Sequence, residues 1–360
     1  MGNQASRVIE RKRDGNAGRK IRRRSTATLQ SHVSHGNYNW IEENQATALS
    51  AGALNAAMAA AQQQQQQQLP QLPQQQPRRK SITEFFTKRK MSFTAVRPSE
   101  EDFREYDRLQ RVHYLLKSAR KANAWAPIEA PAAILDIGCG NGIWALEMAT
   151  QFQQSQVLGF DIRPPPEQTA GPKNLRYVQA NIHERWPMAD NAVDFIFMRN
   201  MAQDIQKQQW PPLLQEMLRV LKPGGYIEVL DIEPQFHNPG PVQQAFDGFR
   251  QGQWTEQGLD FQFCDILEKL LEDTGFAQIE RRMLDIPIGE WPDEPELKQF
   301  GFINKETKKA FLRNRKKELV VKWGISSDDY DMAIQEILEE FDDYHSFSRF
   351  NCWIATKTST

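Results

Sequence analysis

The sequence predicts a doubly wound α/β domain that follows a low-complexity N-terminal tail. From residue 133 onward, short apolar runs alternate with helical segments, which is typical of a parallel sheet buried on both faces. The first apolar run ends in an acid and three alternating glycines, and a helical segment follows at once. This arrangement indicates a strand–loop–helix unit whose backbone can approach a ligand closely.

The chain divides by charge near residue 97. Residues 1–97 hold 16 Lys and Arg against 5 Asp and Glu, whereas residues 98–360 hold 29 against 41. The first part also contains an Ala-rich stretch, seven consecutive glutamines at 62–68 and a Pro/Gln linker. Because such a segment cannot bury enough apolar surface to offset its chain entropy, we expect a disordered basic tail over 1–97. The rest suits one α/β domain with insertions.

The first residues fit the pattern for N-myristoylation, since removal of Met1 exposes Gly2 and Ser6 stands at the preferred position. One acyl chain binds membranes only marginally, but the basic runs between Arg7 and Arg24 add attraction to an anionic membrane surface. We therefore expect membrane association through this lipid anchor. The alternative is a tail whose basic runs serve nuclear import or RNA contact, with the chain in the nucleus or cytoplasm.

Cysteine usage and hydropathy indicate an intracellular chain without a transmembrane segment. Cys139, Cys264 and Cys352 have no metal-binding or redox spacing, and no secretory signal is present. No apolar run is long enough to span a bilayer. We therefore expect a reducing compartment and no resident metal.

Three short motifs in the tail suggest regulation or partners. Ser25 and Ser81 each follow three basic residues, as in sites for basophilic kinases. The segment from Ser81 to Phe86 resembles the box that binds sliding clamps, although Arg79 stands where that motif has glutamine. The alternative for this apolar segment is that Phe85 and Phe86 pack on the folded domain.

The first strand is predicted over Ala133–Ile137, with a helix from Ile143 to Phe152 after the glycine loop. Gly138 and Gly140 allow a tight turn and close approach of the backbone to a ligand. Asp136 stands at the carboxyl end of the strand, where a carboxylate can meet a cationic group. Cys139 lies between the two glycines.

The second strand is predicted over Gln156–Asp161. Asp161 follows Gly138 by the interval at which an acid accepts both ribose hydroxyls in nucleotide-binding α/β folds. Ile162, the next residue, joins it as a candidate for cofactor contact. An acid in this position predicts a ribose but does not separate one adenosine cofactor from another.

Later segments complete the candidate cofactor site. The third strand, predicted over Leu175–Ala180, leads to Asn181 and Ile182, where an adenine could find an acceptor and an apolar wall. The fourth strand, over Val193–Met198, opens onto Arg199 and Asn200. A Leu-Lys-Pro-Gly-Gly turn at 221–225 precedes the fifth strand, Tyr226–Leu230. This order, with Asp136 and the glycine loop, favours S-adenosylmethionine (SAM) over a dinucleotide.

The motifs resemble those of class I SAM-dependent methyltransferases, and in particular the fungal LaeA-like methyltransferases. Gly142-Ile143-Trp144-Ala145, residues 194–200 and the preceding helix at 105–113 carry this resemblance, which covers about 98–360. It implies a Rossmann-like seven-stranded sheet whose last two strands, Ala277–Ile286 and Asn351–Thr356, form a C-terminal antiparallel hairpin. Two departures from the family stand out: Cys139 and Asn141 replace threonine, and Asn181-Ile182 replaces an acidic pair.

The resemblance also implies that the helix at 105–113 lies over the cofactor. Arg108 is then expected to pair with the SAM carboxylate, and the alternative is an ion pair with Glu105 or Asp107. His113 is expected to pack at the boundary between this helix and the core. Since the sulfonium is a good leaving group, methyl transfer needs mainly alignment and exclusion of water.

No general base is assigned. The candidates at the expected acceptor side are carboxylates and one histidine: Asp204, Asp231, Glu233 and His237. Insertions at about 234–258 and 288–325 carry aromatic residues that predict either a pocket for an apolar or planar acceptor or a small helical subdomain. A basic helical stretch, Lys308–Lys322, indicates an anionic partner or a solvated helix face.

The sequence therefore predicts methyl transfer from SAM to an unidentified small-molecule or lipid-like acceptor. One alternative is a LaeA-like regulatory protein of secondary metabolism and development that acts in a nuclear complex. Another is a fold that has lost SAM binding, against which the intact Asp136, Gly138, Gly140 and Asp161 argue.

Overall fold

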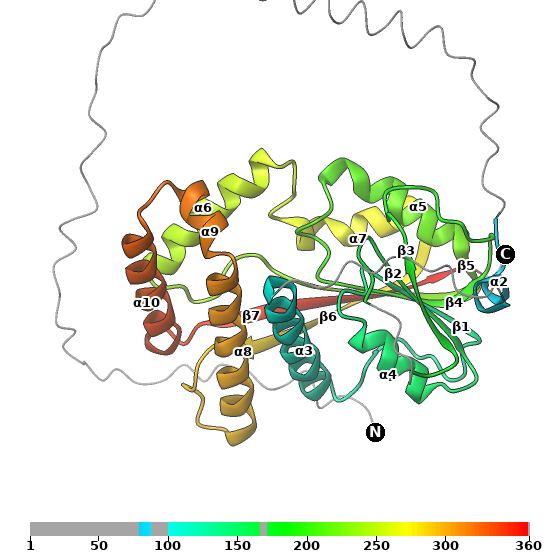
Figure 1. The fold of residues 1–360 in the computed structure, drawn as a ribbon, viewed down its shortest axis with the longest axis horizontal. Helices are drawn as coiled ribbons and strands as arrows, with labels where there is room; N and C mark the ends of the chain where they lie inside the picture. Colours follow the sequence, from blue (N-terminus) through cyan, green and yellow to red (C-terminus); the bar gives the residue numbers. More distant parts are fainter. Residues whose placement is uncertain (1–78, 88–99, 166–170, 359–360) are drawn as a thin grey trace, which may run out of the picture. The chain divides into compact units, whose positions relative to one another are not determined.

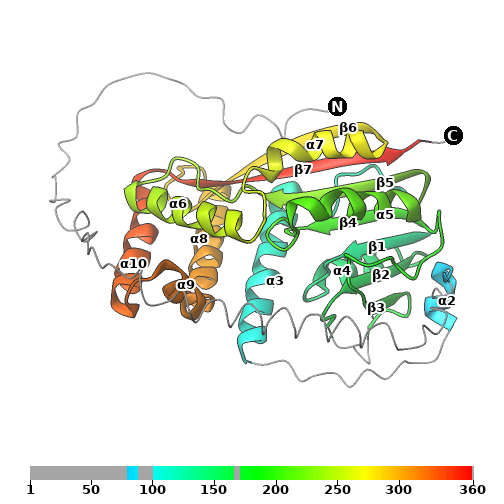
Figure 2. The same ribbon diagram turned by 90° about the horizontal axis from the view of Figure 1, so that it is seen from above.

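The computed structural model describes residues 79–87, 100–165 and 171–358 (Figure 1). Their core is one seven-stranded sheet with the order β3-β2-β1-β4-β5-β7-β6, which Figure 2 shows from above. Strands β1 to β5 run parallel, and β7 pairs antiparallel with both β5 and β6. The predicted doubly wound α/β fold with a C-terminal antiparallel pair is confirmed. The strands are β1 Ala133–Ile137, β2 Gln156–Asp161, β3 Leu175–Gln179, β4 Val193–Arg199, β5 Leu221–Ile232, β6 Phe276–Pro287 and β7 Phe347–Lys357.

Strand β5 begins earlier than predicted. The Lys-Pro-Gly-Gly segment is not a turn outside the sheet, because Val193 already pairs with Leu221 and Phe195 pairs with Tyr226. The extra residues form an irregularity in the ladder, where Gly224 has φ +75°. The left-handed backbone explains the need for glycine at this position.

Helices cover both faces of the sheet. On one face, α3 (Glu100–Arg120), α4 (Ile143–Gln151) and α8 (Pro295–Asn314) share one buried cluster with the strands. On the other, α5 (Trp210–Val220) and α7 (Phe263–Thr274) share a second. A short 3-10 turn, η1 (Lys207–Gln209), precedes α5.

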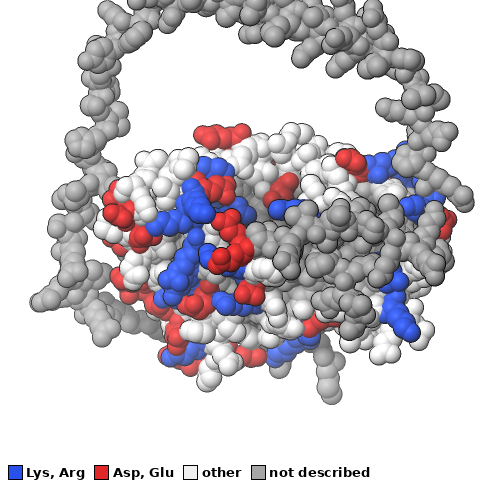
Figure 3. Space-filling model, viewed as in Figure 1, with Lys and Arg blue, Asp and Glu red and all other residues white. Residues whose placement is uncertain are grey.

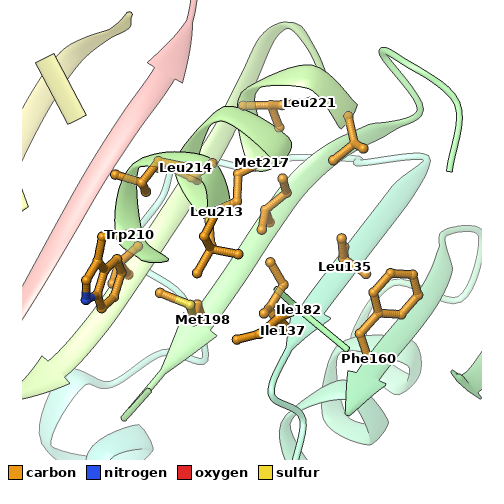
Figure 4. Close-up of a cluster of buried hydrophobic side chains, with 14 of the residues drawn as sticks. Leu135, Ile137, Phe160, Ile182, Met198, Trp210, Leu213, Leu214, Met217 and Leu221 are labelled. Carbon is orange, nitrogen blue, oxygen red and sulfur yellow. The ribbon is translucent and has the colours of Figure 1, made fainter. Parts of the chain in front are cut away.

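Helix α5 shows why these segments form as they do. Its apolar residues recur at helical spacing, so Leu213, Leu214 and Met217 fall on one face and are fully buried. Figure 4 shows this face over Met198 of β4 and Ile137 of β1. Burial of side chains of this size stabilises the fold by about 1.5–3 kcal/mol each.

Part of the predicted tail is folded onto the domain. Lys80 forms a parallel bridge with Met188, and α2 (Ile82–Thr87) follows. The ring of Phe85 lies 6.4 Å from that of Phe160 on β2. The prediction of a disordered tail over 1–97 therefore does not hold for residues 79–87, because their apolar side chains pack against the core of the domain.

The same contacts bear on the resemblance to a clamp-binding box. Phe86 lies under the guanidinium of Arg176, which is 5.3 Å from the ring centroid, and both phenylalanines are partly buried against the core. The predicted packing of these rings on the domain is observed, so they do not project as a free motif. Residues 1–78 and 88–99, with the Gly2 motif and most of the basic runs, lie outside the described residues.

A third cluster lies at one end of the sheet (Figures 1 and 2). It joins α6 (Pro241–Glu256), α9 (Lys316–Trp323) and α10 (Ser327–Asp343) to the end of α8. Its buried residues include Phe246, Leu312, Tyr330, Ile337 and Phe341. Some of the aromatics of the insertions, such as Phe246 and Phe311, thus supply a helical subdomain with its own core, and α10 extends that subdomain beyond the predicted limit at residue 325.

Two further features concern the whole described part. None of its helices is sufficiently long and apolar to span a bilayer. A buried ion pair joins Arg120 at the end of α3 to Glu228 of β5, whose side chains are 2% and 0% exposed. Glu228 also accepts hydrogen bonds from the backbone N–H groups of Trp125 and Ala126, each at 2.7 Å. This carboxylate fixes the chain between α3 and β1.

Candidate functional site

The glycine loop after β1 forms the floor of the candidate site. Gly138, Gly140 and Gly142 have φ angles of +65°, +55° and +75°, which L side chains rarely adopt. A Cβ on Gly138 would lie 2.3 Å from the sulfur of Met201, and one on Gly142 would lie 2.4 Å from the hydroxyl of Tyr177. Glycine is therefore required here by both backbone and space.

Two buried oxygens at this edge of the sheet lack hydrogen-bond partners among the described residues. They are Oδ2 of Asp136, whose side chain is 3% exposed, and Oδ1 of Asn200, a residue with φ +55° after β4. Buried polar groups are nearly always paired, so unpaired oxygens indicate a place for a ligand. Burial raises the pKa of Asp136 to about 8, although the nearby Arg199 lowers it.

Asp161 ends β2 beside this loop. Its Oδ2 accepts a hydrogen bond from the Gly140 N–H at 2.9 Å, and its Oδ1 accepts one from the Arg163 N–H at 2.8 Å. The acid thus ties the glycine loop to the end of β2, and it retains lone pairs for ribose hydroxyls. Ile162 follows with 63% of its surface exposed, as a large apolar side chain next to the predicted ribose acid.

The predicted adenine wall looks different in the structure. The Asn181 side chain is exposed and stabilises a local turn, because its Oδ1 accepts from the His183 N–H and its Nδ2 donates to Glu184. Ile182 is 9% exposed and packs in the core (Figure 4), so it offers little surface to an adenine. Cys139 is also buried, and burial raises the pKa of its thiol.

Arg199 and His113 lie beneath the site. Nη1 of Arg199 is 3.2 Å from Nδ1 of His113, and Nε2 of that histidine is 3.1 Å from Oε2 of Glu147. Burial and the neighbouring Arg199 lower the pKa of His113 to about 4, so the ring is neutral at pH 7. His113 packs at the boundary between α3 and the core, as predicted. Burial also lowers the pKa of Arg199 to about 10.

Helix α3 covers the glycine loop. The carbonyl of Tyr106 accepts a hydrogen bond from Asn141 Nδ2 at 3.1 Å, and Leu109 lies 3.4 Å from the Cβ position of Gly140. Arg108 forms an ion pair with Glu105, the predicted alternative to a contact with SAM. Its Nε lies 3.0 and 2.9 Å from the two carboxylate oxygens of Glu105. Its pairing with the SAM carboxylate stays a prediction.

Most candidate bases are already engaged. Asp231 accepts backbone hydrogen bonds from Met201, Ala202 and Ile232, each at 2.9 Å, and thereby fixes the loop after β4. Glu233 Oε2 lies 2.8 Å from His237 Nε2. That histidine is 18% exposed and stacks on the Phe347 ring, so it is not a free loop residue.

Asp204 is the candidate acid whose surroundings join the cofactor edge to the helical subdomain. Burial raises the pKa of its carboxyl, the charge of Asp161 raises it further and that of Arg315 lowers it. Asp204 therefore lies within electrostatic range of the predicted ribose acid and of the basic residue between α8 and α9. None of these contacts assigns a proton-transfer role.

The sequence did not predict a charged cluster between α6 and α8. Asp247, Arg250 and Lys308 lie there close to Phe236. A signal was present in the sequence, because Arg250 follows the buried Phe246 by four residues and so shares its helix face. A cation on a buried helix face indicates a polar partner or a ligand.

The residues present at the sheet edge fit SAM. Asp136 and Asn200 offer unpaired acceptors to the amino acid end, the glycine loop admits a close ligand, and Asp161 can accept from the ribose. When bound, SAM supplies a methyl group on a cationic sulfur that leaves readily. Of the predicted adenine contacts, Asn181 is exposed and Ile182 is buried, and the exposed Ile162 offers an apolar surface beside Asp161.

Comparison with known proteins agrees with this site. Residues 105–281 match a family model for a methyltransferase domain. Methyltransferase pytC of Aspergillus terreus is 30% identical over 212 residues, which are 57% of this chain and 64% of pytC. Secondary metabolism regulator LAE1 of Cochliobolus heterostrophus is 29% identical over 211 residues, or 55% of this chain and 67% of LAE1. Protein-methionine methyltransferase laeA of Emericella nidulans is 29% identical over 219 residues, 56% of each chain.

The chain thus spans less than two thirds of the length of pytC and of laeA. Among solved structures, phosphoethanolamine N-methyltransferase 2 of Haemonchus contortus in complex with S-adenosyl-L-methionine is 20% identical, with a TM-score of 0.42 over 69% of this chain and 52% of that one. The family match and the curated relatives show that residues 105–281 are similar to methyltransferase domains, and that the relatives include LaeA-like methyltransferases.

Proposed function

We propose that the chain is an active enzyme that transfers the methyl group of SAM to a small-molecule or lipid-like acceptor. The observation that carries this proposal is the unpaired carboxylate oxygen of Asp136, buried beside a glycine loop at the carboxyl edge of the sheet. A buried carboxyl with one unpaired oxygen is costly, so its presence at this position supports a role in binding a ligand.

In this reaction the residues of the chain bind and orient the cofactor and keep water away from it. Asp136 and Asn200 hold the amino acid end of the cofactor, and Asp161 holds the ribose. Helix α3 lies over the glycine loop through Tyr106 and Leu109, so it shields the cofactor from solvent. Methyl transfer then depends on the alignment of the acceptor with the sulfonium, which the neighbouring helical subdomain provides.

A regulatory role is the second candidate, and the names of two relatives favour it. LAE1 and a laeA protein are described as secondary metabolism regulators. In that case the chain acts within a nuclear complex, with a protein side chain as one candidate acceptor. Cofactor binding is common to both roles, whereas location and acceptor separate them.

Calorimetric titration of the full chain with SAM and S-adenosylhomocysteine (SAH) tests the proposal. We expect micromolar binding to the wild-type chain and a loss of about tenfold or more in Asp161→Asn, because the amide replaces an acceptor of ribose hydroxyls. Asp331→Asn is the matched control, since Asp331 lies on α10 with a 63% exposed side chain. Folded wild-type protein that binds neither compound would overturn the proposal.

A further inference from the structure

The charged cluster between α6 and α8 is built from partly buried groups. Arg250 projects from α6 and donates a hydrogen bond to the carbonyl oxygen of Pro234. The ammonium of Lys308 on α8 lies 5.8 Å from the centroid of the Phe236 ring. In the described part of the chain, neither cation forms an ion pair with a carboxylate, although most other basic residues of α8 and α9 do.

Burial makes this lack of partners costly. The pKa of Lys308 falls to about 7 because the group is buried and because Arg250 and Arg108 add positive charge. The pKa of Arg250 is lowered as well, first by burial and then by the charge of Arg315. Like charges gathered in a poorly hydrated place are unfavourable unless an anion joins them.

Asp247 is the acid within range of both cations, but it is engaged elsewhere. Its Oδ2 accepts a hydrogen bond from the Phe236 N–H at 2.7 Å, and its Oδ1 is buried without a partner. Burial raises the pKa of this carboxyl to about 6, which weakens it as a counter-ion. One partly protonated acid therefore faces two cations.

The cluster is connected to the cofactor edge by two routes. Helix α3 carries Arg108, which adds to the positive charge at Lys308, next to Leu109, which packs on the glycine loop. Arg315, which acts on Arg250, also acts on Asp204, and that acid is within range of Asp161. The guanidinium of Arg108 also lies over the Phe311 ring of α8, so the helix that carries Lys308 is next to the helix that packs on the glycine loop.

Aromatic rings line the same region. The Phe236 ring is next to Lys308, and the Phe311 ring lies under two guanidinium groups, those of Arg108 at 5.7 Å and Arg315 at 5.3 Å. A flat apolar body can pack on such rings while an anionic group meets the cations. Other basic side chains of α8 and α9 are mixed with acidic ones on the surface, as Figure 3 shows, so Lys308 and Arg250 differ from them.

We propose that Arg250 and Lys308 form an anion-binding subsite for the methyl acceptor, which carries a carboxylate or phosphate group on an apolar or aromatic body. This inference rests on the proposed methyl transfer and narrows its substrate class. Arg250 recognises the anion through its planar guanidinium, and Lys308 adds a point charge. The methylated atom lies on the same body, nearer the glycine loop.

The test uses the full chain saturated with SAH and three calorimetric probes: benzoate, phenyl phosphate and the neutral benzamide. We expect millimolar binding of at least one anion, at least about tenfold weaker binding in Lys308→Gln and in Arg250→Gln, and no binding of benzamide. Comparison of benzoate with phenyl phosphate distinguishes a carboxylate site from a phosphate site. Lys309→Gln is the matched control, because Lys309 is the next residue on the same helix and pairs with Glu306 at 3.4 Å.

Thermal unfolding of the variants gives a readout that does not depend on the ligand. Removal of an unpaired buried cation leaves the melting temperature of Lys308→Gln at or above the wild-type value, whereas a purely structural lysine would lower it. Lys308→Arg keeps the charge and is expected to keep anion binding.

Three results would overturn the inference. Benzamide could bind as tightly as benzoate, both anions could bind equally to the wild-type chain and to Lys308→Gln, or neither anion could bind at all. Loss of SAH affinity in Lys308→Gln or Arg250→Gln would show that the pair serves the cofactor carboxylate instead. If SAH does not bind the wild-type chain, it is the proposed function that fails, and this titration is done first.

Discussion

Replacement of Asp136 by asparagine is expected to change the free energy of unfolding and the affinity for SAM in opposite directions. The carboxyl is 3% exposed and its pKa is raised to about 8 from an ordinary 3.8. Between these values the folded chain holds a proton that the unfolded chain releases, so stability falls as pH rises from about 4 to about 8. At pH 7 the penalty is at most about 4 kcal/mol, at about 1.36 kcal/mol for each of some three pH units above 3.8.

We expect Asp136→Asn to gain about 2 kcal/mol of stability at pH 7.5, less than this upper limit, because the effective dielectric around a buried carboxylate is higher than that of a dry interior. The gain is expected to shrink as the pH is lowered toward 4 and to vanish well below the pKa of 3.8, where the folded and unfolded carboxyls are both protonated. The same variant is expected to bind SAM at least about tenfold more weakly, since the cationic end of the cofactor favours the ionised form of Asp136 and an amide cannot ionise.

Urea unfolding followed by tryptophan fluorescence at pH 4.5, 6 and 7.5 (values chosen to span roughly the titration range) measures the first effect, and calorimetry measures the second. Asp190→Asn is the control, because the hydrogen bond from Arg219 lowers the pKa of Asp190, so the effect of this substitution on stability is expected to stay constant between about pH 4.5 and 7.5. A loss of stability in Asp136→Asn that is equal at all three pH values would refute the reasoning.

Three further predictions follow from individual contacts. Gly142→Ala is expected to destabilise the chain by about 1–3 kcal/mol in urea, because φ is +75° and the new Cβ meets the hydroxyl of Tyr177; an unchanged midpoint would contradict the packing of the loop. Glu228→Gln leaves Arg120 buried without its counter-ion and is expected to cost about 3–5 kcal/mol by the same measurement, whereas a cost below about 1 kcal/mol would contradict that burial. Gly2→Ala is expected to move the full chain from the membrane to the soluble fraction of cells if Gly2 is myristoylated, and an unchanged distribution would favour the nuclear alternative.

The strands and the glycine loop were predictable because their signals are local. A parallel strand buried on both faces reads as a continuous apolar run, and β1 and β2 begin and end at the predicted residues. The loop after β1 requires glycine at fixed positions, so Gly138 and Gly140 identify it without knowledge of the fold. Asp136 and Asp161 follow from the strand ends that carry them.

Features that depend on distant contacts were not predictable in the same way. Ile182 looked like a wall for adenine, but its side chain is buried in the same core cluster as Phe160 and Trp186, to which no local pattern points. Helix α10 completes the core of the helical subdomain with residues that the sequence alone did not link to α6. The proximity of Arg250 to Lys308 also arises from two helices far apart in the chain.

The most direct test of the account is a crystal structure of the full chain with SAH bound. We expect SAH at the carboxyl edge of the sheet, with its amino acid end at Asp136 and Asn200, its ribose at Asp161 and its adenine beside Ile162. Arg250 and Lys308 should remain free of the cofactor. SAH held elsewhere, for example in the groove between α3 and α4 lined by Tyr114 and Gln151, would contradict the central claim.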